Sequence, residues 1–121
     1  TGRIGGKMGD RRMVEIKTCG GSLFVYSHWD GALMPALAKG AVRAAKPRWD
    51  DQSYAVRILV DQLTRAGRDQ ETDYGLMLTP NAEDEYNHDS PSIIIDLPNK
   101  QLTIIGGGKQ ETLSFEEVTN A

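Results

Sequence analysis

The stretch that decides the fold runs from Met13 to Gly31 and reads MVEIKTCGGSLFVYSHWDG. Apolar and polar residues alternate over 14–17, which is typical of a strand with one solvated face. The Gly-Gly pair at 20–21 can supply the positive φ angles of a tight turn, and a run rich in aromatic and β-branched residues follows at 22–28. The stretch therefore predicts an antiparallel β-hairpin.

Two helices are expected after this hairpin. Pro35 suits a first helical turn, and small or apolar residues recur every three or four positions until Pro47, which ends the helix. Asp50 or Asp51 is expected to cap a second helix, which Gly67 closes. The apolar stripe of this second helix is expected to contain Tyr54, Ala55, Ile58, Leu59 and Leu63.

Three further strands are expected in the remainder of the chain. They run over 74–79, 92–97 and 101–105, and Pro98-Asn99-Lys100 is expected to join the last two in a second hairpin. Gly106–Gly108 is interpreted as a breaker and a flexible linker, and one capped helical turn is expected at 114–117. The order ββααβββ predicts an α+β domain, with an antiparallel sheet of about five strands and two helices packed on one face.

Length and composition fit one domain. The 121 residues include 14 basic and 17 acidic residues, a net charge of −3 that does not favour a nucleic-acid partner or a polybasic membrane binder. No apolar run approaches the roughly 18 residues of a membrane span, and the single cysteine, Cys19, fits a reducing compartment, so a cytoplasmic protein is expected. The domain is expected over 8–121, and 1–7 as a flexible arm or the remnant of an expression tag.

Large apolar groups occupy both faces of the expected sheet. Aliphatic and aromatic side chains alternate over 23–26, and 93–95 is a run of isoleucine. Because two helices cover one face, the other is expected to be covered by the C-terminal segment with Phe115, by the long polar loop at 80–91, or by a second copy of the chain. We expect a homodimer.

A strand meets a helix at His28-Trp29-Asp30-Gly31. An imidazole, an aromatic wall and a carboxylate at a helix N-terminus could line a small polar pocket. Alternatively, Trp29 covers the core, Asp30 caps the helix and Gly31 permits the turn. The similar corner at 49–51 favours this structural interpretation.

No catalytic residue, metal site or cofactor is predicted. The acidic loop at 83–89 lacks the glycine and the ligand spacing of a calcium-binding hand. The segment Gly106–Lys109 lacks the spacing of a phosphate-binding loop, and no histidine adjoins Cys19 in the sequence. An enzyme is therefore not favoured.

Four motifs are spread over about residues 8–121: Met8-Gly9-Asp10-Arg11, His28-Trp29-Asp30-Gly31, Arg48-Trp49-Asp50-Asp51 and Ser114-Phe115-Glu116-Glu117. With these motifs the chain resembles a family of short proteins of unassigned activity that phages, prophages and bacterial genomes encode. The resemblance implies the setting of a mobile genetic element and a host or phage protein as partner, and it transfers no catalytic residue.

Two functions remain in view. The first is a non-enzymatic protein-interaction module that uses the exposed aromatic side of the sheet around Phe24, Tyr26 and His28. The second is a small-molecule or nucleotide-binding domain with a pocket at the His28 corner, formed with Trp29, Asp30 and Arg57.

Overall fold

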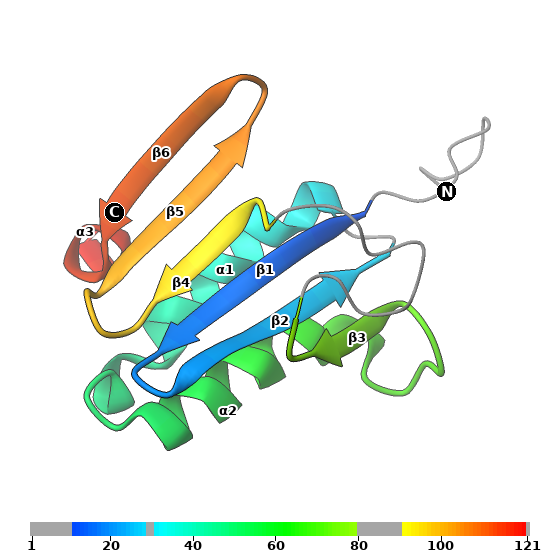
Figure 1. Cartoon of the computed structure of the whole chain (residues 1–121), viewed down its shortest axis with the longest axis horizontal. Helices are drawn as coiled ribbons and strands as arrows, with labels where there is room; N and C mark the ends of the chain where they lie inside the picture. The colour runs from blue at the N-terminus through cyan, green and yellow to red at the C-terminus, as the bar shows by residue number, and fades with distance from the viewer. Residues whose placement is uncertain (1–10, 29–30, 80–90, 121) are drawn as a thin grey trace.

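The computed structural model describes residues 11–28, 31–79 and 91–120. They form an α+β fold with one mixed sheet of six strands and two main helices (Figure 1). In chain order the strands and helices are β1 (Arg12–Thr18), β2 (Gly21–Ser27), α1 (Met34–Ala44), α2 (Gln52–Thr64), β3 (Tyr74–Met77), β4 (Ile93–Asp96), β5 (Gln101–Gly106), β6 (Lys109–Ser114) and α3 (Phe115–Asn120). Single 3₁₀ turns occur at Gly31–Leu33, Lys46–Arg48 and Arg65–Gly67.

The sheet has the strand order β3-β2-β1-β4-β5-β6. The predicted hairpin is confirmed, because β1 and β2 pair antiparallel, and β4 and β5 form a second hairpin. The expectation of a wholly antiparallel sheet is wrong, because β1 pairs parallel with β4. After β2 the chain passes through α1, α2 and β3 before it returns on the other side of β1, and this long connection permits a parallel neighbour.

The sheet contains one strand more than the five expected. Gly107 and Gly108 have φ angles of 59° and 76°, and Gly106 pairs with Lys109, so the glycines form a two-residue hairpin turn rather than a flexible linker. The turn leads into β6, whose residues are mostly exposed and polar and therefore lack the apolar alternation that marks a strand in sequence. The capped helical turn after β6 is confirmed as the start of α3.

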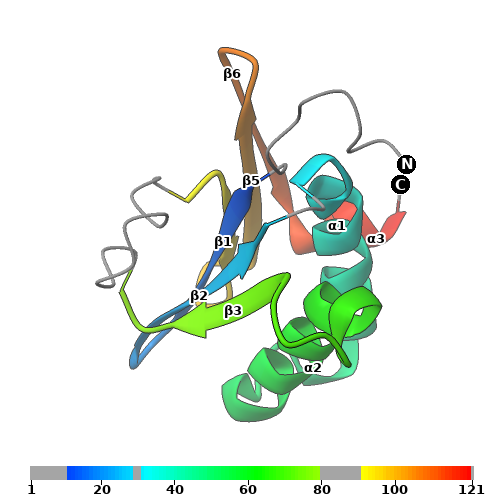
Figure 2. The same cartoon turned by 90° about the vertical axis from the view of Figure 1, so that its right-hand side faces the viewer.

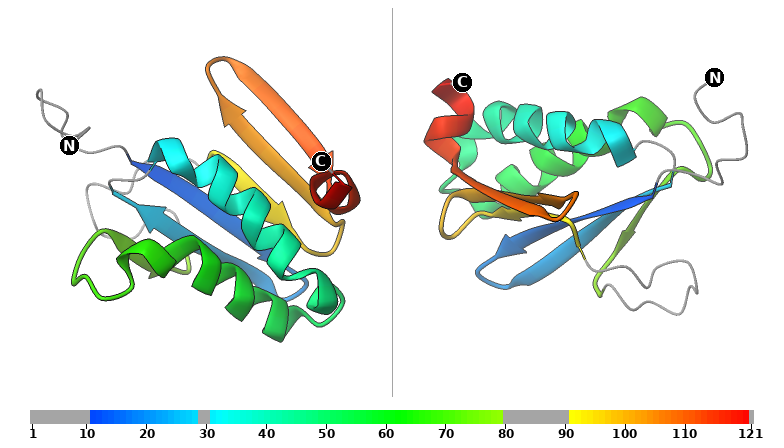
Figure 3. Two further views of the ribbon diagram at one scale, coloured as in Figure 1. Left: turned by 180° about the vertical axis from the view of Figure 1, so that it is seen from behind. Right: turned by 90° about the horizontal axis from the view of Figure 1, so that it is seen from above.

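The main core lies between the sheet and the helices, which share one face (Figures 2 and 3). Strand register places Val14, Val25 and Ile93 on this face, where they are buried. Phe115, at the start of α3, lies on the same side, with its ring centroid 5.0 Å from that of Trp49. Phe115 is therefore not the cover of the opposite face, which corrects that expectation.

The opposite face also buries apolar side chains. Met13 and Phe24 lie there because they alternate with the core residues of β1 and β2, and they are 2% and 6% exposed. Phe24 is thus not an exposed aromatic group, contrary to expectation. Tyr26 and Ile94 also lie on this face, and both are partly exposed. Residues 80–90 of the loop that was expected to cover the face lie outside the described part of the chain.

The helices begin and end close to the predicted positions. Pro35 lies in the first turn of α1. Asp51 stands at the N-cap of α2, although its carboxylate accepts no hydrogen bond from the backbone N–H groups of the first turn. Ala55, Leu59 and Leu63 are buried as predicted. Tyr54 is 56% exposed, which corrects its place in the apolar stripe. Its ring centroid lies 5.3 Å from Cζ of Arg48, in a cation–π contact.

Candidate functional site

His28 lies just beyond the end of β2, beside Tyr26. The Tyr26 hydroxyl and His28 Nδ1 are 2.6 Å apart, and their ring centroids are 5.9 Å apart. The His28 N–H donates to the carbonyl oxygen of Asp73 at 2.8 Å, which extends the pairing of β2 with β3 by one residue pair. Two of the predicted site residues are therefore brought together, and both are partly exposed.

The face of the sheet that carries Tyr26 points away from the helices. Tyr26 lies opposite Met13 on β1 and opposite Gly75 on β3. Among the described residues, no heavy atom would lie within 4 Å of a Cβ atom placed on Gly75, which stands beside Tyr26 on the outermost described strand. The partly exposed Met77 shares this face two residues further along β3.

Two exposed leucines lie on β3 and directly after it. Leu76 is 54% exposed and Leu78, just after the strand, is 78% exposed. Leu76 lies opposite Val25 and therefore on the helix side of the sheet. We call this outer part of the sheet the β2–β3 edge, because β2 is the one described strand that pairs with β3. It has Leu76 on its helix side, Tyr26, His28 and Met77 on its other side, and Leu78 just after the strand.

Sequence reasoning placed these leucines in a strand but did not select them as site residues. The run from Tyr74 to Thr79 indicates a strand without saying whether it is central or outermost. Its position in the sheet depends on pairing with β2, which lies about fifty residues earlier in the chain. The signal that could have selected it is its shortness, since short strands are often used at sheet edges.

The other predicted site residues do not join this surface. Arg57 is exposed on α2, on the helix side of the sheet, where its charge acts on Asp61. Tyr26 and His28 face the opposite side, so the structure does not assemble His28 with Arg57 in one pocket. Trp29 and Asp30 lie outside the described residues.

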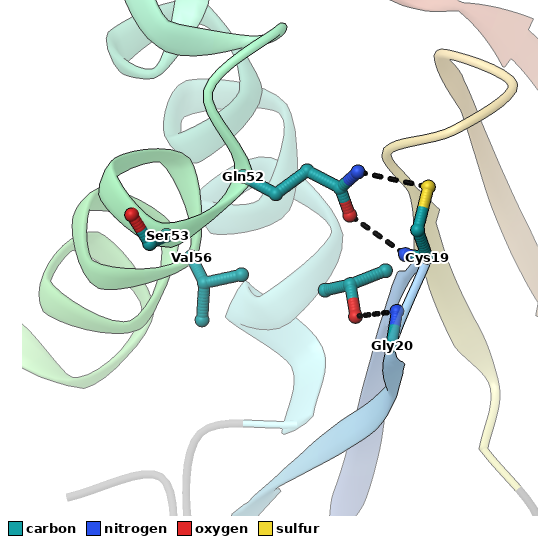
Figure 4. A pocket seen from close by; sticks show the side chains of 6 residues that line it. Cys19, Gly20, Gln52, Ser53 and Val56 are labelled. Atoms are coloured by element: carbon teal, nitrogen blue, oxygen red, sulfur yellow. Dashed lines mark hydrogen bonds between the residues drawn. The ribbon is translucent and has the colours of Figure 1, made fainter.

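An open depression of about 490 Å³ lies where the β1–β2 turn meets the start of α2 (Figure 4). The Gln52 side chain spans it: Oε1 accepts from the Cys19 N–H at 2.7 Å, and Nε2 donates to Cys19 Sγ at 3.0 Å. The remaining lining residues are Thr18, Gly20, Ser53 and Val56, and none of the six is a histidine or a carboxylate. The arrangement joins the hairpin to α2, and it does not place a general base beside the cysteine.

The sequence analysis also considered a glycine-rich turn and an acidic loop as ligand sites. Gly106 and Lys109 pair to close a hairpin, and both line an open depression of about 470 Å³ together with Arg12, Pro35, Ile104, Gln110 and Glu111. In the ranges 11–28, 31–79 and 91–120, no group of three or more histidine, cysteine, aspartate or glutamate side chains is placed to hold a metal ion. The acidic residues at 83–89 lie outside these ranges.

Comparisons with protein-family models, with curated proteins and with solved structures found no match. Among the described residues, none of the helices combines the length and the apolar character needed to cross a membrane.

Proposed function

We propose that the protein is a non-enzymatic interaction module that binds an extended apolar segment of a partner protein along the β2–β3 edge. The observation that carries the proposal is the exposure of Leu76 on the outermost described strand and of Leu78 just after it. Large exposed apolar side chains that lie together on an open sheet edge are typical of a surface that a partner strand covers.

The backbone of β3 supports this mode of binding. The hydrogen bond from His28 N–H to Asp73 O shows that residues at this pairing position direct their backbone groups between β2 and β3. Gly75 and Met77 follow at intervals of two and therefore also face β2, whereas the N–H and C=O of Leu76 point toward the open edge. An added strand can exchange main-chain hydrogen bonds with Leu76.

The side chains of the edge suggest which residues the partner strand carries. Side chains on one side of that strand would pack on Leu76, and those on the other side would pack beside Gly75 and on Met77. A partner segment with apolar residues on both sides fits this edge better than a charged one. The resemblance to phage and prophage proteins makes a host or phage protein the proposed source of the segment.

The test uses a displayed library of random peptides as the probe and the whole chain as the target. We expect the wild type to select peptides with successive β-branched or aromatic residues, and the double variant Leu76→Asp, Leu78→Asp to reduce their affinity by at least about tenfold, because a carboxylate next to an apolar side chain must be desolvated.

The matched control is Leu33→Asp, which places the same charge at a leucine that is 58% exposed outside the β2–β3 edge. This variant should bind the selected peptides as the wild type does. Equal loss of affinity in the control and the double variant, or selection of no apolar peptide by a folded wild type, would refute binding at the edge.

A further inference from the structure

The β5–β6 hairpin projects beyond the other strands at the end of the sheet opposite to β3 (Figures 1 and 2). Every residue from Ile105 to Thr112 is exposed. Strand β6 has β5 as its one described neighbour, so its outer side, which we call the β6 edge, is open along the projecting part.

The hairpin register determines which backbone groups the β6 edge presents. Phe115 N–H donates to the carbonyl oxygen of Lys100 at 2.9 Å, so the odd-numbered residues of β6 direct their backbone groups toward β5. The backbone groups of Gln110 and Thr112 therefore point outward. Ser114 N–H already donates to Glu117 Oε1 at 2.8 Å, which ends the edge available for pairing.

The side chains on this edge include opposite charges at a spacing of two residues. Lys109 and Glu111 lie opposite Gly106 and Ile104, and both line an open depression that also includes Pro35 of α1. They therefore share the helix side of the sheet. A lysine on an edge strand usually discourages pairing, but here a carboxylate of equal and opposite charge stands beside it.

We propose that two copies of the protein pair antiparallel along their β6 edges, with Gln110 of one copy opposite Gln110 of the other. In this register each Lys109 lies opposite Glu111 of the second copy, on the same face of a sheet that continues from one copy into the next. Gln110 and Thr112 supply outward N–H and C=O groups to the new ladder.

Neighbouring registers are less favourable. Centring the pair on Glu111 places the two Glu111 carboxylates directly opposite each other, which is destabilising. Centring it on Thr112 places Ser114 in a hydrogen-bonded position, although its N–H is already used by Glu117. Charge and backbone pairing thus select the register centred on Gln110, and a second copy is the partner that supplies both complementary charges.

This self-pairing is independent of the proposed partner binding, because the β6 edge and the β2–β3 edge are the two opposite ends of the sheet. The test measures the solution mass of the full chain by light scattering over a concentration series. The wild type should form a dimer that weakens as salt is raised, since the charges involved are exposed.

Charge reversal tests the register. Lys109→Glu and Glu111→Lys should each raise the dimer dissociation constant by at least about tenfold, because each places like charges opposite one another. The double variant Lys109→Glu, Glu111→Lys restores opposite charges and should return the constant to within about threefold of wild type. Lys46→Glu makes the same charge change at an exposed position outside the edge and should have no effect.

Gln110→Pro gives a second test that does not depend on charge. Its lost N–H points outward, so the β5–β6 ladder keeps its hydrogen bonds. The ladder between copies loses both hydrogen bonds of its central Gln110 pair, because each copy carries the substitution. The variant should be folded by circular dichroism and monomeric. A wild type that stays monomeric at all concentrations, or a dimer that both single charge reversals leave unchanged, would overturn the proposal.

Discussion

Asp61 of α2 interacts with three arginines, Arg57, Arg65 and Arg68. Its carboxylate accepts hydrogen bonds from Arg65, one turn further along, and from Arg68 at 2.9 Å. The Arg65 hydrogen bond is the main cause that lowers the pKa of Asp61 below its ordinary value of 3.8; partial burial opposes it, and the charges of Arg65, Arg68 and Arg57 add to the lowering. The ionised form is therefore favoured in the folded chain.

The acid dependence of stability follows from this lowered pKa. Asp61 contributes stability fully above the unfolded pKa, and the contribution is lost as the pH falls through the lower folded pKa. We expect urea midpoints measured from about pH 6 to about pH 2 to fall less steeply below about pH 4 in Asp61→Asn than in the wild type. Asp69→Asn, which removes the same charge at an exposed neighbouring site, should retain the wild-type slope. Identical acid-side slopes in wild type and Asp61→Asn would contradict this assignment.

Among the helices and strands, the packing of the start of β3 against the end of α2 depends on Gly67. The glycine is buried in the 3₁₀ turn after α2, and a Cβ atom placed on it would lie 2.7 Å from two ring carbons of Tyr74 and 3.0 Å from Asp73 Oδ2. The residue was expected to close the helix. The structure shows a further role for Gly67: the absence of a side chain there allows Tyr74, the first residue of β3, to pack against the end of α2.

Replacing this glycine should therefore loosen the edge strand. Gly67→Ala is expected to lower the free energy of unfolding by about 1–3 kcal/mol, since the Tyr74 ring must move. The matched control is Gly40→Ala within α1, where a Cβ atom would meet nothing within 4 Å and alanine should raise stability by about 0.5–1 kcal/mol. Denaturant unfolding of both variants checks the opposite signs, and the same sign for both would refute the close-packing explanation.

At the scale of the whole molecule, α3 closes the core from the far end of the chain. Phe115 is 1% exposed and packs against the Trp49 ring. The Trp49 Nε1–H donates a hydrogen bond to the Val42 carbonyl oxygen at 2.9 Å. Arg43 of α1 donates from Nε to the carbonyl oxygen of Val118 at 3.0 Å. The helix that follows β6 is thus attached to α1, and this attachment supports the base of the projecting hairpin.

Removing the Phe115 ring should affect the entire fold. Phe115→Ala is expected to lower the free energy of unfolding by about 3–5 kcal/mol, because it leaves a cavity beside Trp49. Phe115→Leu keeps most of the volume and should cost less than half as much. Chemical denaturation followed by circular dichroism measures both, and a loss below about 1 kcal/mol for Phe115→Ala would show that α3 is not part of the core.

The candidate sites could be predicted from the sequence in part. Tyr26 and His28 were selected as neighbours two residues apart on one strand face, and the structure places them in contact. The sequence could not show that Arg57 lies on the other side of the sheet from Tyr26 and His28. The periodicity of a helix indicates which of its own faces is buried, but not the side of the sheet on which the helix packs. The exposed position of Leu76 likewise depends on what pairs with β3, rather than on the strand's own residues.

Local sequence patterns were sufficient to predict the two hairpins of β1–β2 and β4–β5, the positions of α1 and α2, and the capped turn that begins α3. Each of these depends on residues close together in the chain, whose spacing and turn chemistry act locally. Local patterns did not predict three further features: the parallel pairing of β1 with β4, the strand character of the polar β6, and the burial of Phe24 and Phe115 on opposite sides of the sheet. These features arise from contacts between segments far apart in sequence, and such contacts depend on how the layers pack.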